Sequence, residues 1–233
     1  MYKINTLHLI EGAKQAEGLT VIIDVFRAFS LECYLYDMGV REIRPVGTIE
    51  EAFNLNSQIK DSILIGERHG EKCDGFDYGN SPSSIVKLHV ADKTIIHTTS
   101  AGTQGIVNAV GASEIITGSL VNAKAVARYI MTWQPEVVSL VCMGNGGVRP
   151  APEDELCAEY IISILEEREF PDLKQKVSEL KNHGGEHFFD SSKQHIFPEA
   201  DFWMCVKYDL FPFVIKVEQD EIGFVTRKEN ILL

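Results

Sequence analysis

Acidic and basic side chains follow several short apolar runs in this sequence, at spacings that suit an anion or a metal ion. The first set, Asp24-Val25-Phe26-Arg27, comes directly after the apolar run Thr20–Ile23. An aspartate there can ligate a divalent cation, and the arginine can donate two hydrogen bonds to a phosphate or carboxylate. The same pair could instead form an ion pair or an N-cap that only stabilises the turn. We predict that Asp24 and Arg27 are catalytic and that Asp24 also binds a metal ion.

A second polar set follows the apolar run 63–65. It begins with Gly-Glu-Arg at 66–68 and continues into an irregular glycine-rich stretch at 75–82, and long loops inside compact domains are usually functional. The candidate side chains here are Glu67, Arg68, Asp77, Asn80 and Ser81. We expect the two acids to bind a metal ion, the Glu-Arg pair to act in catalysis, and the last two to contact phosphate. Ser81-Pro82 is also typical of a helix start, whose free N–H groups suit an anion.

Two further stretches of small polar residues, 98–103 and 145–147, follow predicted strands. Hydroxyl and backbone N–H groups in such turns can hold an anion, although turns without a ligand have the same composition. The candidate phosphate-binding residues are Thr99, Ser100, Gly102, Thr103, Asn145, Gly146 and Gly147. Glu153 and Asp154 then stand in the first turn of a predicted helix, where acids often only complement the helix dipole. Both are also candidate metal ligands.

Several carboxylates on loops at one edge of a sheet favour a hard cation, and magnesium is the cation we expect. Other phosphate chemistries lack their motifs. The sequence after Asp24 has no second aspartate of the haloacid-dehalogenase type, and neither a Walker A motif nor GxGxxG occurs. Cys142 stands one residue too far from Arg149 for the Cx5R loop of cysteine phosphatases, so we expect this thiol to be structural.

Strand-like and helix-like segments alternate through the first two thirds of the chain, which predicts a three-layer α/β/α fold with a largely parallel or mixed sheet. The predicted strands are 20–23, 43–46, 63–65, 94–96, 114–116 and 137–141. The predicted helices are 29–38, 48–58, 83–89, 103–109, 123–131 and 153–167. Ligands of open parallel sheets bind beyond the carboxyl ends of the strands, where the four polar sets would meet.

The sequence from Val21 onward aligns with the sequence from Thr94 onward at an offset of 72–74 residues. We therefore consider a single domain, 1–233, that contains an internal duplication (18–90 and 91–168, units of about 73 residues) and a C-terminal extension, 169–233. Any two βαβ units share such features, so we give equal weight to a true duplication and to a chance similarity. If it is real, two polar loops at equivalent positions should face each other.

The C-terminal extension has a weaker pattern. Residues 172–181 predict a short polar helix, and 182–195, which holds three histidines, a surface loop or lid. Residues 213–217 and 222–227 alternate like a hairpin that could add edge strands or form an interface in a homodimer.

Composition limits the partners and the location. A net charge of −12 disfavours nucleic acid, whereas local cations, N–H groups and a metal ion could still bind a small anionic substrate. The sequence shows neither a signal peptide nor an apolar run of about 18 residues, so we expect no membrane partner and a cytoplasmic location. The five cysteines contain no CxxC pair and are typical of reduced thiols.

The four polar sets together resemble the 2-phosphosulfolactate phosphatases of coenzyme M biosynthesis. The segments that carry the resemblance are VIIDVFRAFS, GERHG with GFDYGNSP, HTTSAGTQGI, and CMGNGG with EDELCAEYI. They occur in order and extend from roughly Thr20 to Ile161. Phe26, Phe29 and Ser100-Ala101 depart from the usual pattern of the family, which bears on the choice of substrate more than on the fold.

The resemblance implies a magnesium-dependent phosphatase that converts 2-phospho-3-sulfolactate to 3-sulfolactate and phosphate, or acts on a related 2-hydroxy acid phosphate. Magnesium held by some of the candidate carboxylates would polarise the phosphoryl oxygens, and either water or Asp24 would attack phosphorus. Arg27 and Arg68 would bind phosphate or the other anionic groups of the substrate. The alternative is a non-catalytic protein that binds an anionic metabolite with the same loops.

Overall fold

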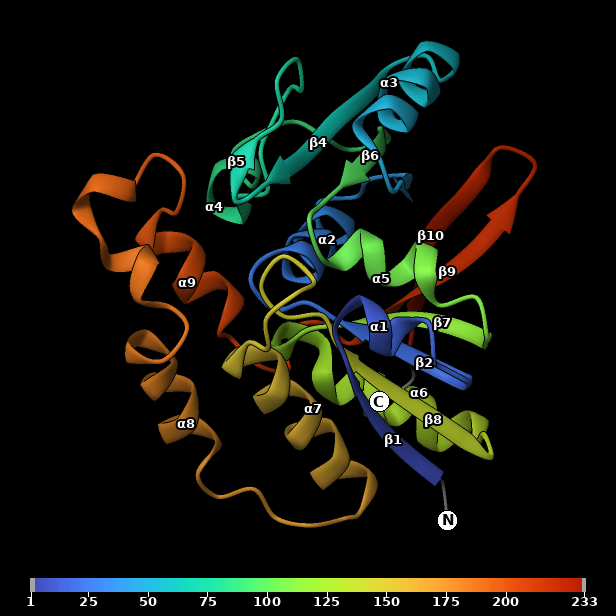
Figure 1. The fold of residues 1–233 in the computed structure, drawn as a ribbon, viewed down its shortest axis with the longest axis vertical. Helices are drawn as coiled ribbons and strands as arrows, with labels where there is room; N and C mark the ends of the chain where they lie inside the picture. Colours follow the sequence, from blue (N-terminus) through green and yellow to red (C-terminus); the bar gives the residue numbers. More distant parts are fainter. Residues whose placement is uncertain (1–2, 232–233) are drawn as a thin grey trace.

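The computed structural model of the protein describes residues 3–231, in which one ten-stranded mixed sheet is surrounded by helices (Figure 1). The strands are β1 (Lys3–His8), β2 (Gly18–Ile23), β3 (Glu42–Pro45), β4 (Ser62–Arg68), β5 (Glu71–Lys72), β6 (Thr94–Thr98), β7 (Ala112–Gly118), β8 (Val137–Cys142), β9 (Phe213–Asp220) and β10 (Gly223–Asn230). Their order is β1-β8-β2-β7-β9-β10-β3-β6-β4-β5. The predicted α/β class with a mixed, largely parallel sheet is confirmed.

The helices follow the predicted ones closely. They are α1 (Leu9–Ala13), α2 (Ala28–Asp37), α3 (Ile49–Gln58), α4 (Pro82–Ile85), α5 (Gly102–Asn108), α6 (Ala123–Trp133), α7 (Pro152–Leu165), α8 (Leu173–Glu179) and α9 (Glu199–Cys205). Helix α4 is shorter than predicted, because after Val86 the chain continues in turns toward β6. Strands β1 and β5 and helices α1 and α9 were not predicted.

Alternate residues of β2 show how helices cover both faces of the sheet. Val21 and Ile23 are fully buried in one core cluster with α6 and α7, whereas Ile22 is buried in another with α1 and α5. Successive side chains of a strand point to opposite faces, so a strand covered on both sides is apolar throughout. This part of the molecule therefore has the three-layer arrangement that the sequence predicted.

The C-terminal hairpin lies in the middle of the sheet, and the prediction that it adds edge strands was wrong. Strand β9 pairs antiparallel with β7, and β10 pairs antiparallel with β3. The hairpin thus separates two parallel groups of opposite sense, β1-β8-β2-β7 and β3-β6-β4. Phe213, Val214 and Ile215 are buried, as an internal strand requires. The carboxyl ends of the strands in one group therefore point in the opposite direction to those in the other group.

The two proposed repeats interleave across this hairpin. Strand β2 of the first repeat lies between β7 and β8 of the second, and β6 of the second lies between β3 and β4 of the first. The polar loops after β2 and β6 come together, since a Cβ atom on Gly102 would lie 2.8 Å from Asp24 Oδ2. This arrangement agrees with the expected facing loops, while the duplication itself stays a prediction.

The segment between α8 and α9 lies at the surface, as predicted, with residues 191–195 exposed, and its centre packs against the body of the protein. It forms short 3-10 turns, and Phe188 at its centre is fully buried. The Phe188 ring lies 5.1 Å from that of Phe26 and 6.1 Å from that of Phe202 in α9. This aromatic packing makes residues 184–197 a wall of the functional site.

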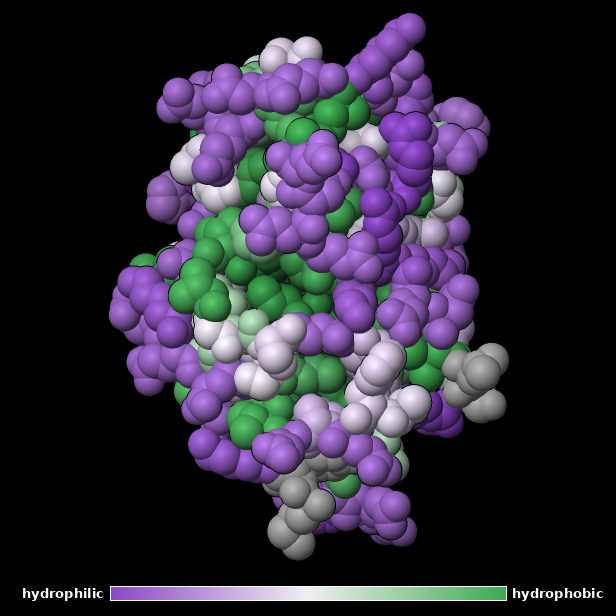
Figure 2. All heavy atoms as spheres, turned by 90° about the vertical axis from the view of Figure 1, so that its right-hand side faces the viewer, coloured by the Kyte–Doolittle hydropathy of each residue, from purple (hydrophilic) through white to green (hydrophobic). Residues whose placement is uncertain are grey.

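On the face that shows the end of the β9–β10 hairpin, apolar atoms gather near the middle among hydrophilic ones (Figure 2). Large apolar residues are exposed on the protein, among them Trp133 and Val110. The expected homodimer stays a prediction.

Within residues 3–231, none of the helices has the length and apolar character needed to cross a bilayer.

Candidate functional site

A cavity of about 410 Å³ lies where loops that follow β2, β8, β4 and β6 come together. We call it the site cavity. The predicted site residues that line it are Asp24, Arg27, Glu67, Asn80, Ser100, Asn145, Gly146 and Glu153. They come from both parallel groups of the sheet, so the fold brings all four polar sets of the sequence to one place.

Asp24 directly follows β2 and lies before the start of α2. Its Oδ1 accepts a hydrogen bond of 3.2 Å from the Ala28 N–H, and the side chain is almost fully buried. Burial raises the pKa of Asp24 from 3.8 to about 7, and the charge of Glu67 adds to the rise, while the Ala28 N–H opposes it. In the absence of a cation, this carboxyl therefore titrates near neutral pH.

Glu67 connects the loops after β4 and β6. Its carboxylate accepts from the Ser100 N–H at 2.6 Å, from the Ser100 hydroxyl at 3.1 Å and from the Gly70 N–H at 2.7 Å. Hydrogen bonds to an ionised acceptor are stronger than neutral ones, so these contacts hold both loops in place. Glu67 thus shapes the cavity wall as well as adding negative charge to it.

The start of α7 supplies two carboxylates with different environments. Asp154 accepts from the Val25 N–H at 2.8 Å and from the Gly144 N–H at 2.7 Å, so it ties the loops after β2 and β8 to the helix. Glu153 lines the cavity, and among residues 3–231 nothing hydrogen-bonds to its buried Oε2. Burial, with a further contribution from the charge of Asp24, raises the pKa of Glu153 to about 7.

These carboxylates fit a divalent cation shared with a bound phosphate. No group of three metal-ligating side chains is close enough to bind an ion alone within the described part of the chain. Magnesium, however, usually takes one or two carboxylates together with substrate phosphates and water. The unpartnered Glu153 Oε2 and the raised pKa values of Glu153 and Asp24 indicate a place where positive charge is needed. Glu153 and Asp24 would hold such an ion.

The guanidinium of Arg27 donates most of its hydrogen bonds to other groups of the protein. Its Nη1 donates to Asp201 Oδ2 and to the Ile196 carbonyl, each at 2.8 Å, and its Nη2 donates to the Gly70 carbonyl at 3.2 Å. Both charged side chains of the Arg27–Asp201 pair are buried, and the guanidinium also lies 4.9 Å from the Phe197 ring centroid. Arg27 therefore fastens α9 and the 184–197 wall to the cavity.

Other predicted site residues lie outside the site cavity. Arg68 donates to the Glu67 and Gly47 carbonyls and to the Thr98 hydroxyl. Ser81 and Asp77 line a neighbouring cavity of about 470 Å³, which shares Arg27, Gly70 and Asn80 with the first. The remaining residues are structural in their contacts: Thr99 and Thr103 each accept the backbone N–H of the other, Gly147 accepts from the Ile10 N–H, and Gly102 leaves space for Asp24.

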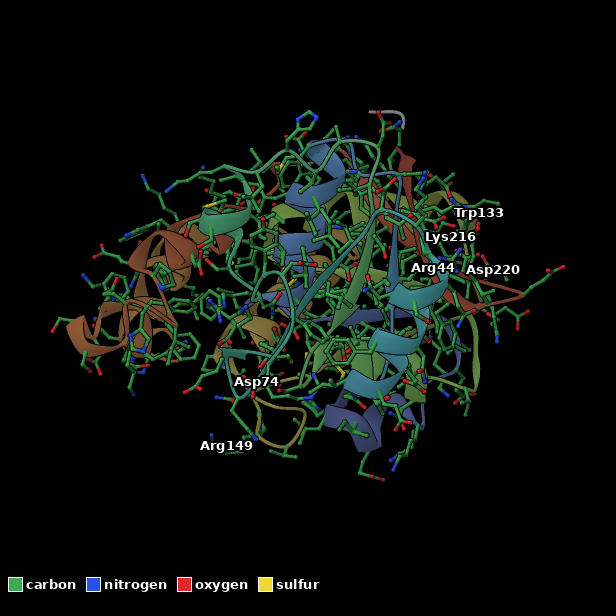
Figure 3. The ribbon with its side chains drawn as sticks, turned by 90° about the horizontal axis from the view of Figure 1, so that it is seen from above. Arg44, Asp74, Trp133, Arg149, Lys216 and Asp220 are labelled. Atoms are coloured by element: carbon green, nitrogen blue, oxygen red, sulfur yellow. The ribbon has the colours of Figure 1, made fainter. Side chains whose placement is uncertain are left out.

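Sequence reasoning did not assign three polar residues that line the site cavity, namely His69, Arg149 and His187. Arg149 is exposed and ends the loop after β8, in which the Asn145 N–H donates to the Arg149 carbonyl at 2.8 Å. Figure 3 shows Arg149 at the outer edge of the molecule. Its place beside Asn145-Gly146-Gly147 was the signal available in the sequence.

The environment of His187 makes it a neutral part of the aromatic wall. Burial lowers the pKa of His187 to about 4, and the charge of Arg27 adds to this effect. Its ring lies 4.3 Å from the Phe188 ring and 4.5 Å from the Phe197 ring. The site cavity thus combines an acidic floor, an arginine at its rim and an apolar wall, an arrangement suited to a small anion that brings a cation with it.

Burial also raises the pKa of the Cys142 thiol, and the charges of Asp154 and Glu155 add to this. A thiol with a raised pKa is a poor nucleophile, which agrees with the structural role predicted for Cys142.

Comparison with known proteins gives one consistent result. Residues 4–220 match the family described as 2-phosphosulpholactate phosphatase. A probable 2-phosphosulfolactate phosphatase of Bacillus subtilis (strain 168) is 32% identical over 218 residues, which cover 92% of each chain. Another, of Carboxydothermus hydrogenoformans, is 40% identical over 176 residues, covering 75% of this chain and 72% of the relative.

Proposed function

The chain belongs to the 2-phosphosulfolactate phosphatase family, a family of phosphoric monoester hydrolases, and we propose that it hydrolyses 2-phospho-3-sulfolactate to 3-sulfolactate and phosphate with magnesium as cofactor. A related 2-hydroxy acid phosphate is the other substrate within this proposal. The observation that carries it is the site cavity, where Asp24, Glu67 and Glu153 face a rim that carries Arg149. A phosphate ester with further anionic groups needs both a cation and positively charged side chains.

Glu153 and Asp24 would hold the magnesium ion, which when bound supplies Lewis-acid polarisation of the phosphoryl oxygens. Both carboxyls become fully ionised beside a cation, because opposite charge favours the charged form. Glu67 and Asp154 contribute differently. Each uses its oxygens for backbone N–H groups, so they fix the loops on which the ligands stand.

The remaining residues of the cavity bind and orient the substrate. Arg149, which is exposed at the rim, is available to pair with the sulfonate or carboxylate of the substrate. The amide of Asn80 would face the phosphate, whereas the Ser100 hydroxyl donates to Glu67 and helps to hold the loop after β6. Phe26, Phe188 and Phe197 form the apolar side and limit access of water, which strengthens the charged interactions inside.

The reaction is tested by phosphate release from 2-phospho-3-sulfolactate and from 2-phospholactate, each with magnesium and with EDTA. We expect magnesium-dependent release that is faster with the sulfonated ester. Release that persists in EDTA would contradict the cofactor, and equal rates would contradict the role of the sulfonate. Binding of both esters without any release would instead favour a non-catalytic binding protein.

A cytoplasmic location is part of the same proposal. All five cysteines are free and buried, which supports a reducing compartment.

A further inference from the structure

A buried chain of hydrogen bonds leads from α2 through β6 to the site cavity. Glu32 Oε1 lies 2.8 Å from Nδ1 of His97, and His97 Nε2 lies 3.2 Å from Asn80 Oδ1. Glu32 and His97 are fully buried, and Asn80 is 5% exposed. Asn80 lines the site cavity, so this chain ends where the proposed function places phosphate. Glu32 and His97 take no part in the chemistry described above.

The contact with Asn80 fixes which ring nitrogen of His97 carries a proton. A carboxamide oxygen can only accept, so Nε2 must be the donor. At the other side of the ring, Nδ1 faces a carboxyl oxygen of Glu32. Either Nδ1 is protonated and Glu32 is a carboxylate, or Glu32 is protonated and donates to Nδ1. In both cases the Nε2–H is required, because the Asn80 oxygen that it faces can only accept.

The Nε2–H in turn holds the Asn80 amide in this orientation. Because Oδ1 is held by His97, the amide nitrogen Nδ2 points away from the ring. In the part of the chain that the structure describes, no side-chain or backbone oxygen accepts from Asn80 Nδ2, and this nitrogen is not enclosed. Its two N–H groups are therefore free for a ligand in one of the two cavities that Asn80 lines. If the amide were reversed, an oxygen with the same negative polarity as a phosphate would face the ligand.

We propose that His97, set by Glu32, is a positioning residue that turns the N–H groups of Asn80 into the site cavity to bind the oxygens of a phosphate group. The inference rests on the proposed function only for the identity of the anion. The geometry of Glu32, His97 and Asn80 does not depend on turnover.

The first experiment is nitrogen NMR of the ¹⁵N-histidine-labelled protein, which reports the protonation of each ring nitrogen. We expect Nε2 of His97 to be protonated in the wild type and in Glu32→Gln, whose amide can still donate to Nδ1. An unprotonated Nε2 in the wild type would overturn the proposal. This result is independent of whether the protein hydrolyses any ester.

The second experiment measures the Kd of inorganic phosphate in the presence of magnesium by calorimetry. Asn80→Asp, which replaces the amide N–H groups by an oxygen of the same size, should weaken binding at least about tenfold, because the donors are lost and the new carboxylate repels the anion. His97→Leu should weaken it similarly. His97→Gln, whose amide can still donate to Asn80 Oδ1, should recover most of the affinity.

A purely structural role predicts a different pattern. The phosphate affinities of His97→Gln and His97→Leu would then follow the unfolding free energies of the two variants. They would not depend on whether residue 97 can donate to Asn80. Unchanged phosphate affinity in folded Asn80→Asp would also overturn the proposal. If the wild type binds phosphate in this way but releases none from phosphate esters, the proposed function fails while the positioning role stands.

Discussion

Replacing Asp24 by asparagine should stabilise the metal-free protein at neutral pH while removing its activity. Asp24 is almost fully buried, and its carboxylate lies near the charge of Glu67. Burying this charge without a cation opposes folding, whereas an asparagine of the same shape carries no charge. The variant thus separates the function of Asp24 from its contribution to stability, as expected for a residue kept for a ligand rather than for the fold.

The magnitude follows from the pKa of Asp24, which rises from 3.8 in the unfolded chain to about 7 in the folded protein. The folded state therefore holds the proton more tightly, so this group stabilises the fold fully below pH 3.8 and that stability is lost as pH rises through 7. At about 1.4 kcal/mol for each pKa unit, the penalty is about 1.5 kcal/mol at pH 5 and about 4 kcal/mol at pH 8. The advantage of Asp24→Asn should grow by about 2.5 kcal/mol over this range.

Urea unfolding in EDTA, followed by tryptophan fluorescence at pH 5 and pH 8, measures this growth. The asparagine loses an acceptor for one backbone N–H, but that cost is the same at both pH values and cancels in the comparison. Asp74→Asn, the same change on an exposed loop, is the matched control and should show no growth. A difference between Asp24→Asn and the wild type that is equal at both pH values would refute the reasoning.

Other expected outcomes concern charges at different depths. Asp201→Ala leaves the buried Arg27 unpaired and should cost about 3 to 5 kcal/mol of unfolding free energy, measured by urea unfolding. Asp220→Ala breaks a pair with Arg44 that reaches solvent (Figure 3) and should cost less than about 1 kcal/mol, and equal costs would contradict the importance of burial. Arg149→Ala should raise KM for 2-phospho-3-sulfolactate about tenfold with an unchanged Tm, and an unchanged KM would exclude a contact with the substrate.

The fold could be predicted as far as local patterns reach. Apolar runs such as Val21-Ile22-Ile23 identified internal strands, because a strand covered on both faces has no polar side. The position of the β9–β10 hairpin could not be predicted, since its strands pair with β7 and β3, about a hundred residues or more away in sequence.

Residues that line the site cavity could be predicted at strand ends, as at Asp24 and Glu67, and at the start of a helix, as at Glu153. The roles of these residues were harder to predict, because each role depends on hydrogen-bond partners that are distant in sequence. Arg27 resembled a free phosphate ligand in sequence, but Asp201 binds it in the structure. His97 gave no signal within an apolar strand, since its partners Glu32 and Asn80 belong to other elements.

The central claim, that phosphate esters are hydrolysed in the site cavity, is tested most directly by one comparison. Phosphate release from 2-phospho-3-sulfolactate is measured with magnesium for the wild type, Asp24→Asn and the control Asp74→Asn, all shown to be folded. The account predicts rapid release by the wild type and the control, and a loss of at least about a hundredfold in Asp24→Asn. Release by Asp24→Asn at the rate of the wild type would contradict it.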